Sequence, residues 1–410
     1  MNNGTGVLSL GIIWFGAAVS VAEIEAGIQF GNNWKALVLG HVLGGLMLFA
    51  VGLIGATYRR NAMESAEECF GKRSSKFFSV LNVFQLVGWT SVMIAQAADA
   101  LSGLDVAIPI PAVCGILALF IALWIFVGLG NSCRLAFAGI APLALLMILL
   151  TYKLFYQMDG FLPIFSESRS FSESFELSIA MPLSWLPLIS DYTKKARNPV
   201  LGAGVSATVY TLTSIWMYAI GMGIAAASAC GVIPEASLSG VVSGLGVGLA
   251  GILIIVFSTV TTTFLDAFSA GESAKTIFGR LNSKIAGVAT CALGAVLAIT
   301  GTIEHYTEFL YLIASVFAPM ASVMVVFHYL VRRFLKLESN SARYICAWNG
   351  ISWLAGFSVY QIVVNSPIGA SLAAMLVSGS LAACGLSFKK LYSSSWQKLF
   401  KLPQKISRPK

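Results

Sequence analysis

Three acidic side chains lie inside long apolar segments, where a charged group is most costly. Glu23 and Glu25 belong to the segment 6–30, and Asp266 belongs to the segment 241–274. Because Glu23 and Glu25 are two residues apart, a helix directs them to faces about 200° apart. Glu25 also lies closer to the end of its segment, so we expect Glu23 to face a site. Glu23 and Asp266 are therefore the first candidates for binding a ligand or an ion.

Three hydroxyl-bearing residues form a second candidate, in the same segment as Asp266. Ser258, Thr261 and Thr262 have the spacing i, i+3 and i+4, which places them on one face of a helix. A carbonyl and two hydroxyls there could complete the shell of a hard cation, and oxygen ligands without Cys or His favour sodium over zinc. The alternative is that these hydroxyls bond back to carbonyls of their own helix.

Trp89 lies in the middle of the segment 75–101, far from the membrane interface where tryptophans are usual. A flat indole there offers a wall on which a flat ring can stack, although ordinary core packing is the alternative. Gln96, two turns further on, carries an amide that could pair with a ring edge or with another helix.

The remaining reactive residue types are scattered singly. The seven cysteines form no CxxC pair, and His41 is expected to make a polar contact between helices rather than to bind a metal. The sequence contains no HExxH motif and no GxSxG motif in a plausible elbow, so we expect no enzyme activity and no cofactor.

The elements that carry these residues are membrane helices. The 410 residues are 57% hydrophobic and 11% charged, whereas soluble domains carry about 25% charged residues. Apolar runs of roughly 20 residues predict spanning helices rather than β-strands. We predict an all-α integral membrane protein with twelve spans at 6–30, 34–57, 75–101, 111–129, 134–157, 175–193, 200–226, 241–274, 282–301, 305–331, 343–364 and 367–387.

The distribution of basic residues orients these spans. With the N-terminus inside, the inside segments hold twenty-three Lys and Arg residues, and the outside segments hold only Lys35, Lys153 and Arg169. This is the positive-inside bias of a plasma (inner) membrane protein with both termini in the cytoplasm. The net charge of +8 is thus explained by topology, and we expect no nucleic-acid partner.

Two of the predicted helices are interrupted. Small residues from Gly16 to Ser20 weaken the first span, and Pro182 and Pro187 predict a kink or unwinding of the sixth span near residues 180–184. Breaks five spans apart indicate two inverted repeats with a midplane site. We therefore expect repeats at 1–157 and 158–331, two extra helices at 332–387 and a cytoplasmic tail at 388–410.

These segments resemble the nucleobase–cation symporters. The resemblance rests on FGAAVSVAEIEAG in the first span, the GW pair of the third, WLPLISDYTKKARNP in the sixth and the threonine-rich eighth. Within that family the chain looks most like the CytX-type hydroxymethylpyrimidine transporters. The resemblance implies the five-plus-five inverted repeat of the leucine-transporter fold, with two further helices.

The family's binding residues carry over position by position. The resemblance implies a sodium site built by the carbonyls of Gly16 and Val19 with Ser258, Thr261 and Thr262. It also implies a stacking role for Trp89, while Trp185, Met181 or Pro182 could supply the second wall. Asp266 stands near a position where the family usually has an amide, and Glu23 near one where many members have a small residue. We predict substrate contacts at Trp89, Asp266, Glu23, Ser20, Gln96, Pro182, Ser184 and Trp185.

These two acids favour an aminopyrimidine, because a carboxylic acid can pair with both the exocyclic amino group and the adjacent ring nitrogen. Desolvation favours the protonated form of a buried acid, so that form is reachable near neutrality. We expect a monomeric transporter that imports hydroxymethylpyrimidine with sodium. The alternatives are a proton- or sodium-coupled permease for cytosine, another nucleobase or a small amine, with a channel and a membrane enzyme disfavoured.

Overall fold

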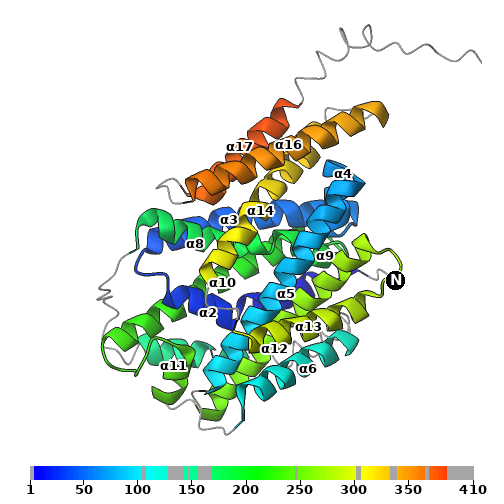
Figure 1. The fold of residues 1–410 in the computed structure, drawn as a ribbon. Helices are drawn as coiled ribbons and strands as arrows, with labels where there is room; N and C mark the ends of the chain where they lie inside the picture. Colours follow the sequence, from blue (N-terminus) through cyan, green and yellow to red (C-terminus); the bar gives the residue numbers. More distant parts are fainter. Residues whose placement is uncertain are drawn as a thin grey trace, which may run out of the picture.

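The computed structural model describes residues 4–102, 108–127, 143–145, 147–155, 169–244, 248–301, 306–332, 339–364 and 369–385. Within these ranges the secondary structure is helical apart from one isolated bridge between Thr5 and Ala196 (Figure 1). The elements are α1 (Val7–Ala18), α2 (Val21–Ile28), α3 (Trp34–Tyr58), α4 (Ala62–Phe70), α5 (Lys72–Ser102), α6 (Ile110–Val127), α8 (Phe171–Ser184), α9 (Leu186–Thr193), α10 (Pro199–Ala229), α11 (Leu238–Gly244), α12 (Gly248–Ile277), α13 (Ser283–Ile299), α14 (Tyr306–Val326), the π-helical turn η1 (Phe327–Val331), α16 (Ser339–Val363) and α17 (Ala370–Cys384).

The helices correspond to the predicted spans. Among the described residues, α3, α5, α10, α12 and α14 with η1 are long and apolar enough to cross a bilayer, and the bent pair α1–α2 makes a sixth. Four shorter helices are also apolar: α6, Leu143–Phe155, α13 and α17. With the pair α8–α9 and with α16, these helices occupy all twelve predicted segments. Residues 134–142, 146 and 156–157 of the fifth segment lie outside the described residues.

The first predicted break is confirmed between α1 and α2. The two helices meet at an angle of 48°, and Val19 between them has φ −76° and ψ 83°. Ser20 is extended and caps α2, because its hydroxyl accepts a hydrogen bond from the Glu23 amide at 3.2 Å. The break thus places backbone polar groups and Glu23 at one point inside the bundle.

The second break occurs later than predicted. Pro182 lies inside α8, which continues to Ser184, and the interruption falls at Trp185 rather than within residues 180–184. Pro187 explains this position: it lies in the first turn of α9, where a proline needs no amide hydrogen, and it would clash with a helix continued through the preceding turn. Two short helices therefore meet at a tryptophan.

Small residues allow the broken helices to pack closely. A Cβ on Gly44 or Gly55 of α3 would lie 2.3–2.4 Å from Pro182 or Ser190, and one on Gly221 of α10 would lie 2.1 Å from the Ile24 carbonyl. Helices α3 and α10 thus hold α8–α9 and α2 at backbone distance, as is common between membrane helices. In Figure 1, α16 and α17 lie beside one another at one side of the bundle and pack on α14.

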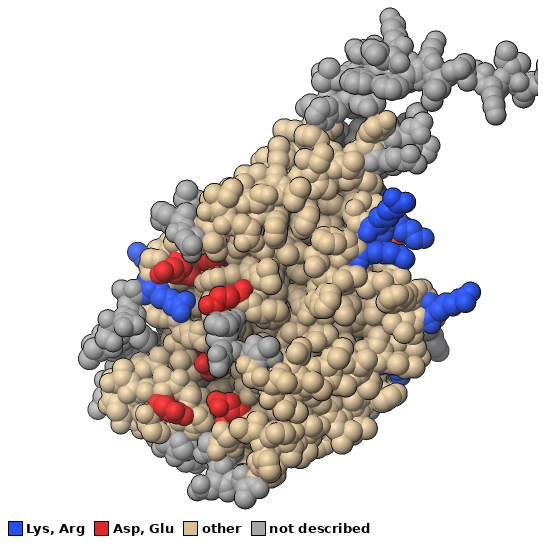
Figure 2. Space-filling view, viewed as in Figure 1, with Lys and Arg blue, Asp and Glu red and all other residues tan. Residues whose placement is uncertain are grey.

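Charge is distributed unevenly over the surface. On the face shown in Figure 2, most visible Lys and Arg side chains gather at the edge where α4 and the N-terminus lie in Figure 1. Arg60 and Arg332 at this edge both pair with Glu68 of α4. Most visible Asp and Glu side chains lie away from it. The edge rich in basic residues is the one that the sequence predicts to face the cytoplasm.

Candidate functional site

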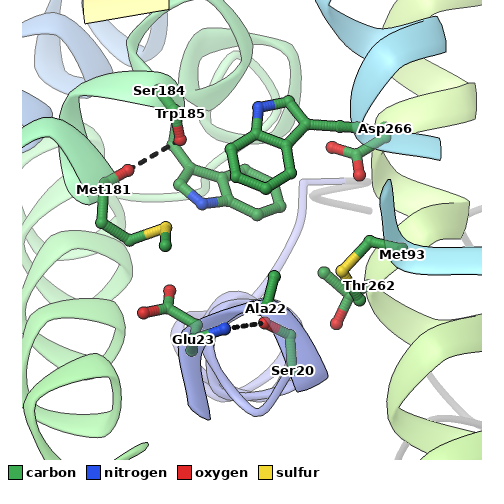
Figure 3. Close-up of a pocket in the computed structure, with 10 residues that line it drawn as sticks. Ser20, Ala22, Glu23, Met93, Met181, Ser184, Trp185, Thr262 and Asp266 are labelled. Carbon is green, nitrogen blue, oxygen red and sulfur yellow. Dashed lines mark hydrogen bonds between the residues drawn. The ribbon is translucent and has the colours of Figure 1, made fainter. Parts of the chain in front are cut away.

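A cavity lies where both helix breaks meet α5 and α12. Its empty volume, which includes the part open to solvent, is about 330 Å³. The side chains converge on it from four sides (Figure 3). The lining residues are Ser20, Ala22, Glu23, Trp89, Met93, Met181, Ser184, Trp185, Thr262 and Asp266.

Six of the eight predicted substrate contacts line this cavity: Ser20, Glu23, Trp89, Ser184, Trp185 and Asp266. Pro182 does not line it, because its ring packs against Gly44 of α3. Gln96 does not line it either, and Met93 takes the place nearer to Trp89. Met93 and Ala22 were not among the predicted contacts, and Met181 appeared only as an alternative second wall.

Two indoles supply flat apolar surface. The Trp89 ring makes edge contacts with Tyr306 and Phe309, at centroid distances of 5.9 and 5.7 Å. Trp185 at the second break packs edge-on against Trp14, at 5.5 Å. Both indoles are held by other rings and are 7% exposed, so each keeps a small surface toward the cavity. Flat heterocycles stack on such surfaces.

Asp266 brings to the cavity a carboxyl group without a protein partner among the described residues. Its side chain points into the cavity from α12 and is 4% exposed (Figure 3). Its carboxyl group makes no hydrogen bond or ion pair with any residue that the structure describes. An unsatisfied buried carboxyl is costly, so this position favours a ligand that brings donors or a positive charge.

Glu23, by contrast, is already bonded within the protein. The Tyr210 hydroxyl donates to Oε1 at 2.6 Å, and the Ser214 hydroxyl is 2.5 Å from Oε2. Both partners come from α10, and the Glu23 side chain is 2% exposed. The two predicted acids therefore face the same cavity in different states, since Glu23 is hydrogen-bonded to α10 and Asp266 has no described partner.

The two serines of the cavity support its backbone. Ser20 accepts from the Glu23 amide, and the Ser184 hydroxyl donates to the Met181 carbonyl at 2.7 Å (Figure 3). The Ser184 hydroxyl has used its hydrogen and offers a ligand only acceptors, whereas the Ser20 hydroxyl can still donate its hydrogen and accept once more.

The predicted cation ligands lie beside the cavity. The Thr262 hydroxyl donates to the Gly16 carbonyl at 2.9 Å and so joins α12 to α1. That carbonyl is available because the Ser20 amide binds Ala18 instead. Val19 is at the break, and Ser258 is one turn before Thr262. One oxygen from each helix, the Gly16 carbonyl and the Thr262 hydroxyl, therefore meets the other at this point.

Thr261 follows the alternative that the sequence left open. Its hydroxyl lies 2.7 Å from the Phe257 carbonyl and 3.1 Å from the Ser258 carbonyl, both in its own helix. Among the described residues there is no group of three or more His, Cys, Asp or Glu that could hold a transition metal.

Polar contacts tie the helices together between the cavity and the basic edge. The Lys194 ammonium is 2.7 Å from Glu272, and Asp191 accepts from Ser269 at 2.7 Å and from the Ala62 amide at 3.0 Å. Burial lowers the pKa of Lys194, but attraction to Asp191 and Glu272 outweighs burial and leaves the pKa above its usual value. These contacts fix α9 against α12 and α4.

The chain matches a known family over most of its length. The sequence model of the family described as "Permease for cytosine/purines, uracil, thiamine, allantoin" matches residues 5–359. The cytosine permeases of Escherichia coli O157:H7 and K12 are each 22% identical over 389 residues, which is 90% of this chain and 88% of theirs.

Solved structures with the same fold include two symporters. Mhp1, a nucleobase-cation-symport-1 family transporter in a closed conformation with bromovinylhydantoin bound, gives a TM-score of 0.80 at 17% identity, covering 98% of this chain and 95% of Mhp1. A Na⁺-coupled sialic acid symporter in a substrate-bound outward-open state gives 0.71 at 12% identity, covering 98% and 92%. The predicted helical transporter fold is confirmed.

Proposed function

Because this chain belongs to the nucleobase–cation symporter family, the permeases for cytosine/purines, uracil, thiamine and allantoin, we propose that it imports an aminopyrimidine together with sodium. Hydroxymethylpyrimidine, the precursor of the thiamine pyrimidine ring, is the proposed substrate. The chain is a transporter and not an enzyme, as are the relatives that it matches. We further propose that it works as a monomer in the cell inner (plasma) membrane with both termini in the cytoplasm.

The bare carboxyl of Asp266 is the observation that carries the substrate proposal. An aminopyrimidine presents an amino hydrogen and a ring nitrogen side by side, and a protonated carboxyl can accept from the first and donate to the second. The Trp89 and Trp185 indoles, which line the same cavity, would take the two faces of the ring. The Ser20 and Ser184 oxygens can accept from the hydroxymethyl group.

Sodium is proposed as the co-substrate because oxygen donors of α1 and α12 meet at the cavity. The ion would lie between the Gly16 carbonyl and the Thr262 hydroxyl, which are now joined by a hydrogen bond. Thr262 also lines the cavity, so the ion and the substrate would share a wall. A Na⁺-coupled symporter with the same fold supports this choice.

The experiment is a binding screen on the purified protein. Thermal stability is measured with hydroxymethylpyrimidine, cytosine, uracil and allantoin, each with sodium and with potassium in its place. We expect hydroxymethylpyrimidine to give the largest stabilisation, and only with sodium. Equal stabilisation by uracil would contradict the role given to Asp266, and equal stabilisation in potassium would contradict sodium coupling.

A further inference from the structure

A chain of buried hydrogen bonds leads from Glu23 away from the cavity. Glu23 Oε2 is 2.5 Å from Ser214 Oγ, which is 2.8 Å from Nε2 of His41. On the other side of the imidazole, Nδ1 is 2.7 Å from Ser178 Oγ and 3.2 Å from the Leu37 carbonyl. The chain joins α2, α10, α3 and α8, and each of its four side chains is at most 2% exposed.

Counting hydrogens fixes one end of this chain. The Ser178 hydroxyl donates to the Leu37 carbonyl at 2.7 Å, so its single hydrogen is used there. Ser178 Oγ can then only accept from His41, which requires a hydrogen on Nδ1. A second acceptor, the Leu37 carbonyl, faces the same nitrogen. This pairing favours a hydrogen on Nδ1 of His41.

At the other end, one serine hydrogen lies between two groups. In one arrangement Glu23 is protonated and donates to Ser214, which donates to Nε2 of a neutral His41. In the other, Ser214 donates to the Glu23 carboxylate and accepts from Nε2 of an imidazolium. Both arrangements satisfy every contact, and both leave the chain with no net charge. They differ only in the position of one proton.

Other arrangements are worse. An ionised Glu23 beside a neutral His41 leaves an unbalanced buried charge, which is expensive in a low-dielectric interior. In this arrangement one ring nitrogen without a hydrogen faces another acceptor, either Nδ1 against the Leu37 carbonyl or Nε2 against the Ser214 oxygen. A protonated Glu23 beside an imidazolium places two donors on Ser214 and a net positive charge in the core. A single proton shared by Glu23 and His41 is therefore the most stable arrangement of this chain.

The described groups that interact electrostatically with Glu23 are tyrosines: Tyr210 and Tyr218 of α10 and Tyr306 of α14. The elements packed around the pair also carry these titratable or charged side chains: Glu25 of α2, Lys35 and Tyr58 of α3, Lys72, Arg73, Lys76 and Asp99 of α5, Glu173 and Glu176 of α8, Asp266, Glu272 and Lys275 of α12, and Glu308 and Tyr311 of α14. The tyrosines are neutral near physiological pH. Glu176 is occupied by donors of α16 and α17, and Asp266 lies on another wall of the cavity. No Lys or Arg side chain is among the described partners of Glu23 or His41.

We propose that Glu23, Ser214 and His41 form a proton-binding site distinct from the cation site, whose single proton lies on Glu23 in the empty cavity and passes to His41 when a ligand donor enters. The Glu23 O–H bond breaks as a Ser214 O–H bond forms, while the original Ser214 O–H bond breaks as an N–H bond forms at His41 Nε2. A ligand donor stabilises the carboxylate, which drives the shift. The site uses the cavity of the proposed function but does not depend on the identity of the ligand.

Nitrogen NMR of the histidines tests this site directly. The chain has three histidines, so His305→Gln and His328→Gln variants assign the His41 signals in protein labelled with ¹⁵N-histidine. In the ligand-free protein we expect a neutral imidazole with hydrogen on Nδ1. Hydrogen on Nε2 alone would overturn the proposal whether or not any ligand binds. With hydroxymethylpyrimidine and sodium bound, we expect the imidazolium, and a His41 that stays neutral would also overturn it.

Matched variants separate the relay from simple burial. Ser214→Ala should lose the imidazolium signal and Ser214→Thr should restore it, while Ser206→Ala, a buried serine of the same helix bonded only to Gly202, should behave as wild type. Glu23→Gln should keep His41 neutral in every condition, and this decides the question if Ser214→Ala does not fold. An imidazolium in Glu23→Gln would overturn the proposal. If hydroxymethylpyrimidine does not bind, the proposed function fails, and the ligand-free tautomer alone decides on the proton site.

Discussion

Replacing Asp266 with Asn should change which pyrimidines bind rather than weaken all of them. Asp266 faces the cavity without a hydrogen bond from the described residues, so its carboxyl is free to meet the ligand. An Asn amide can still accept from the amino group, but it donates to the ring nitrogen more weakly than a carboxylic acid does, and a neutral hydrogen bond contributes about 0.5–1.5 kcal/mol. Binding of hydroxymethylpyrimidine should therefore weaken by about 2- to 12-fold. The analogue with an oxo group in place of the amino group should lose less affinity, because the Asn amide can donate to the oxo oxygen.

The assay is isothermal titration of both ligands in detergent, with Asp99→Asn as the control. Asp99 is an exposed acid of α5 outside the cavity, and its replacement should leave both affinities unchanged. The melting temperature of Asp266→Asn should not fall, because the substitution removes a buried carboxyl that bonds to no residue the structure describes. Equal weakening of both ligands, or no change in either, would refute the proposed contact.

Three further outcomes follow from the structure. Trp89→Ala should weaken substrate binding at least tenfold, since stacking on an aromatic ring is worth roughly 1–3 kcal/mol. Trp89→Phe should lose less affinity. If the Ala variant binds the substrate as wild type does, the substrate ring lies elsewhere. Thr262→Ala should abolish the effect of sodium on substrate affinity in the same titrations. Thr259→Ala should retain the effect, because Thr259 is a buried threonine of α12 whose hydroxyl has no hydrogen-bond partner in the described part of the chain. Glu176→Gln should lower the melting temperature, because it leaves the Tyr360 hydroxyl and the start of α17 without a carboxylate. The control Glu173→Gln, at an exposed position, should change the melting temperature little. If both variants melt at the same temperature, the contacts of Glu176 contribute nothing to stability.

Periodicity and charge predicted the helices well, because both are local properties of the chain. The position of the second break depended on the competition between two prolines. Pro182 fits inside α8 against Gly44, and Pro187 instead determines the break at Trp185. The first break was predictable from Gly16 to Ser20, since small residues and a capping serine act over a few positions.

The site was predictable in its residue types and less so in its partners. Gln96 lies on the same helix face as Trp89, but seven residues along a helix is about 10 Å, and Met93 at four residues is within reach of the cavity. The different states of Glu23 and Asp266 depend on Tyr210 and Ser214, which are almost two hundred residues from Glu23. Only the packing of α10 on α2 shows which acid is satisfied.

Uptake into vesicles tests the central claim most directly. The purified protein is placed in liposomes, and entry of labelled hydroxymethylpyrimidine is followed with an inward sodium gradient, with a proton gradient alone, and with neither. We expect accumulation above the outside concentration only with the sodium gradient, and its loss when an ionophore collapses that gradient. Equal uptake under all three conditions, or accumulation driven by protons without sodium, would contradict it.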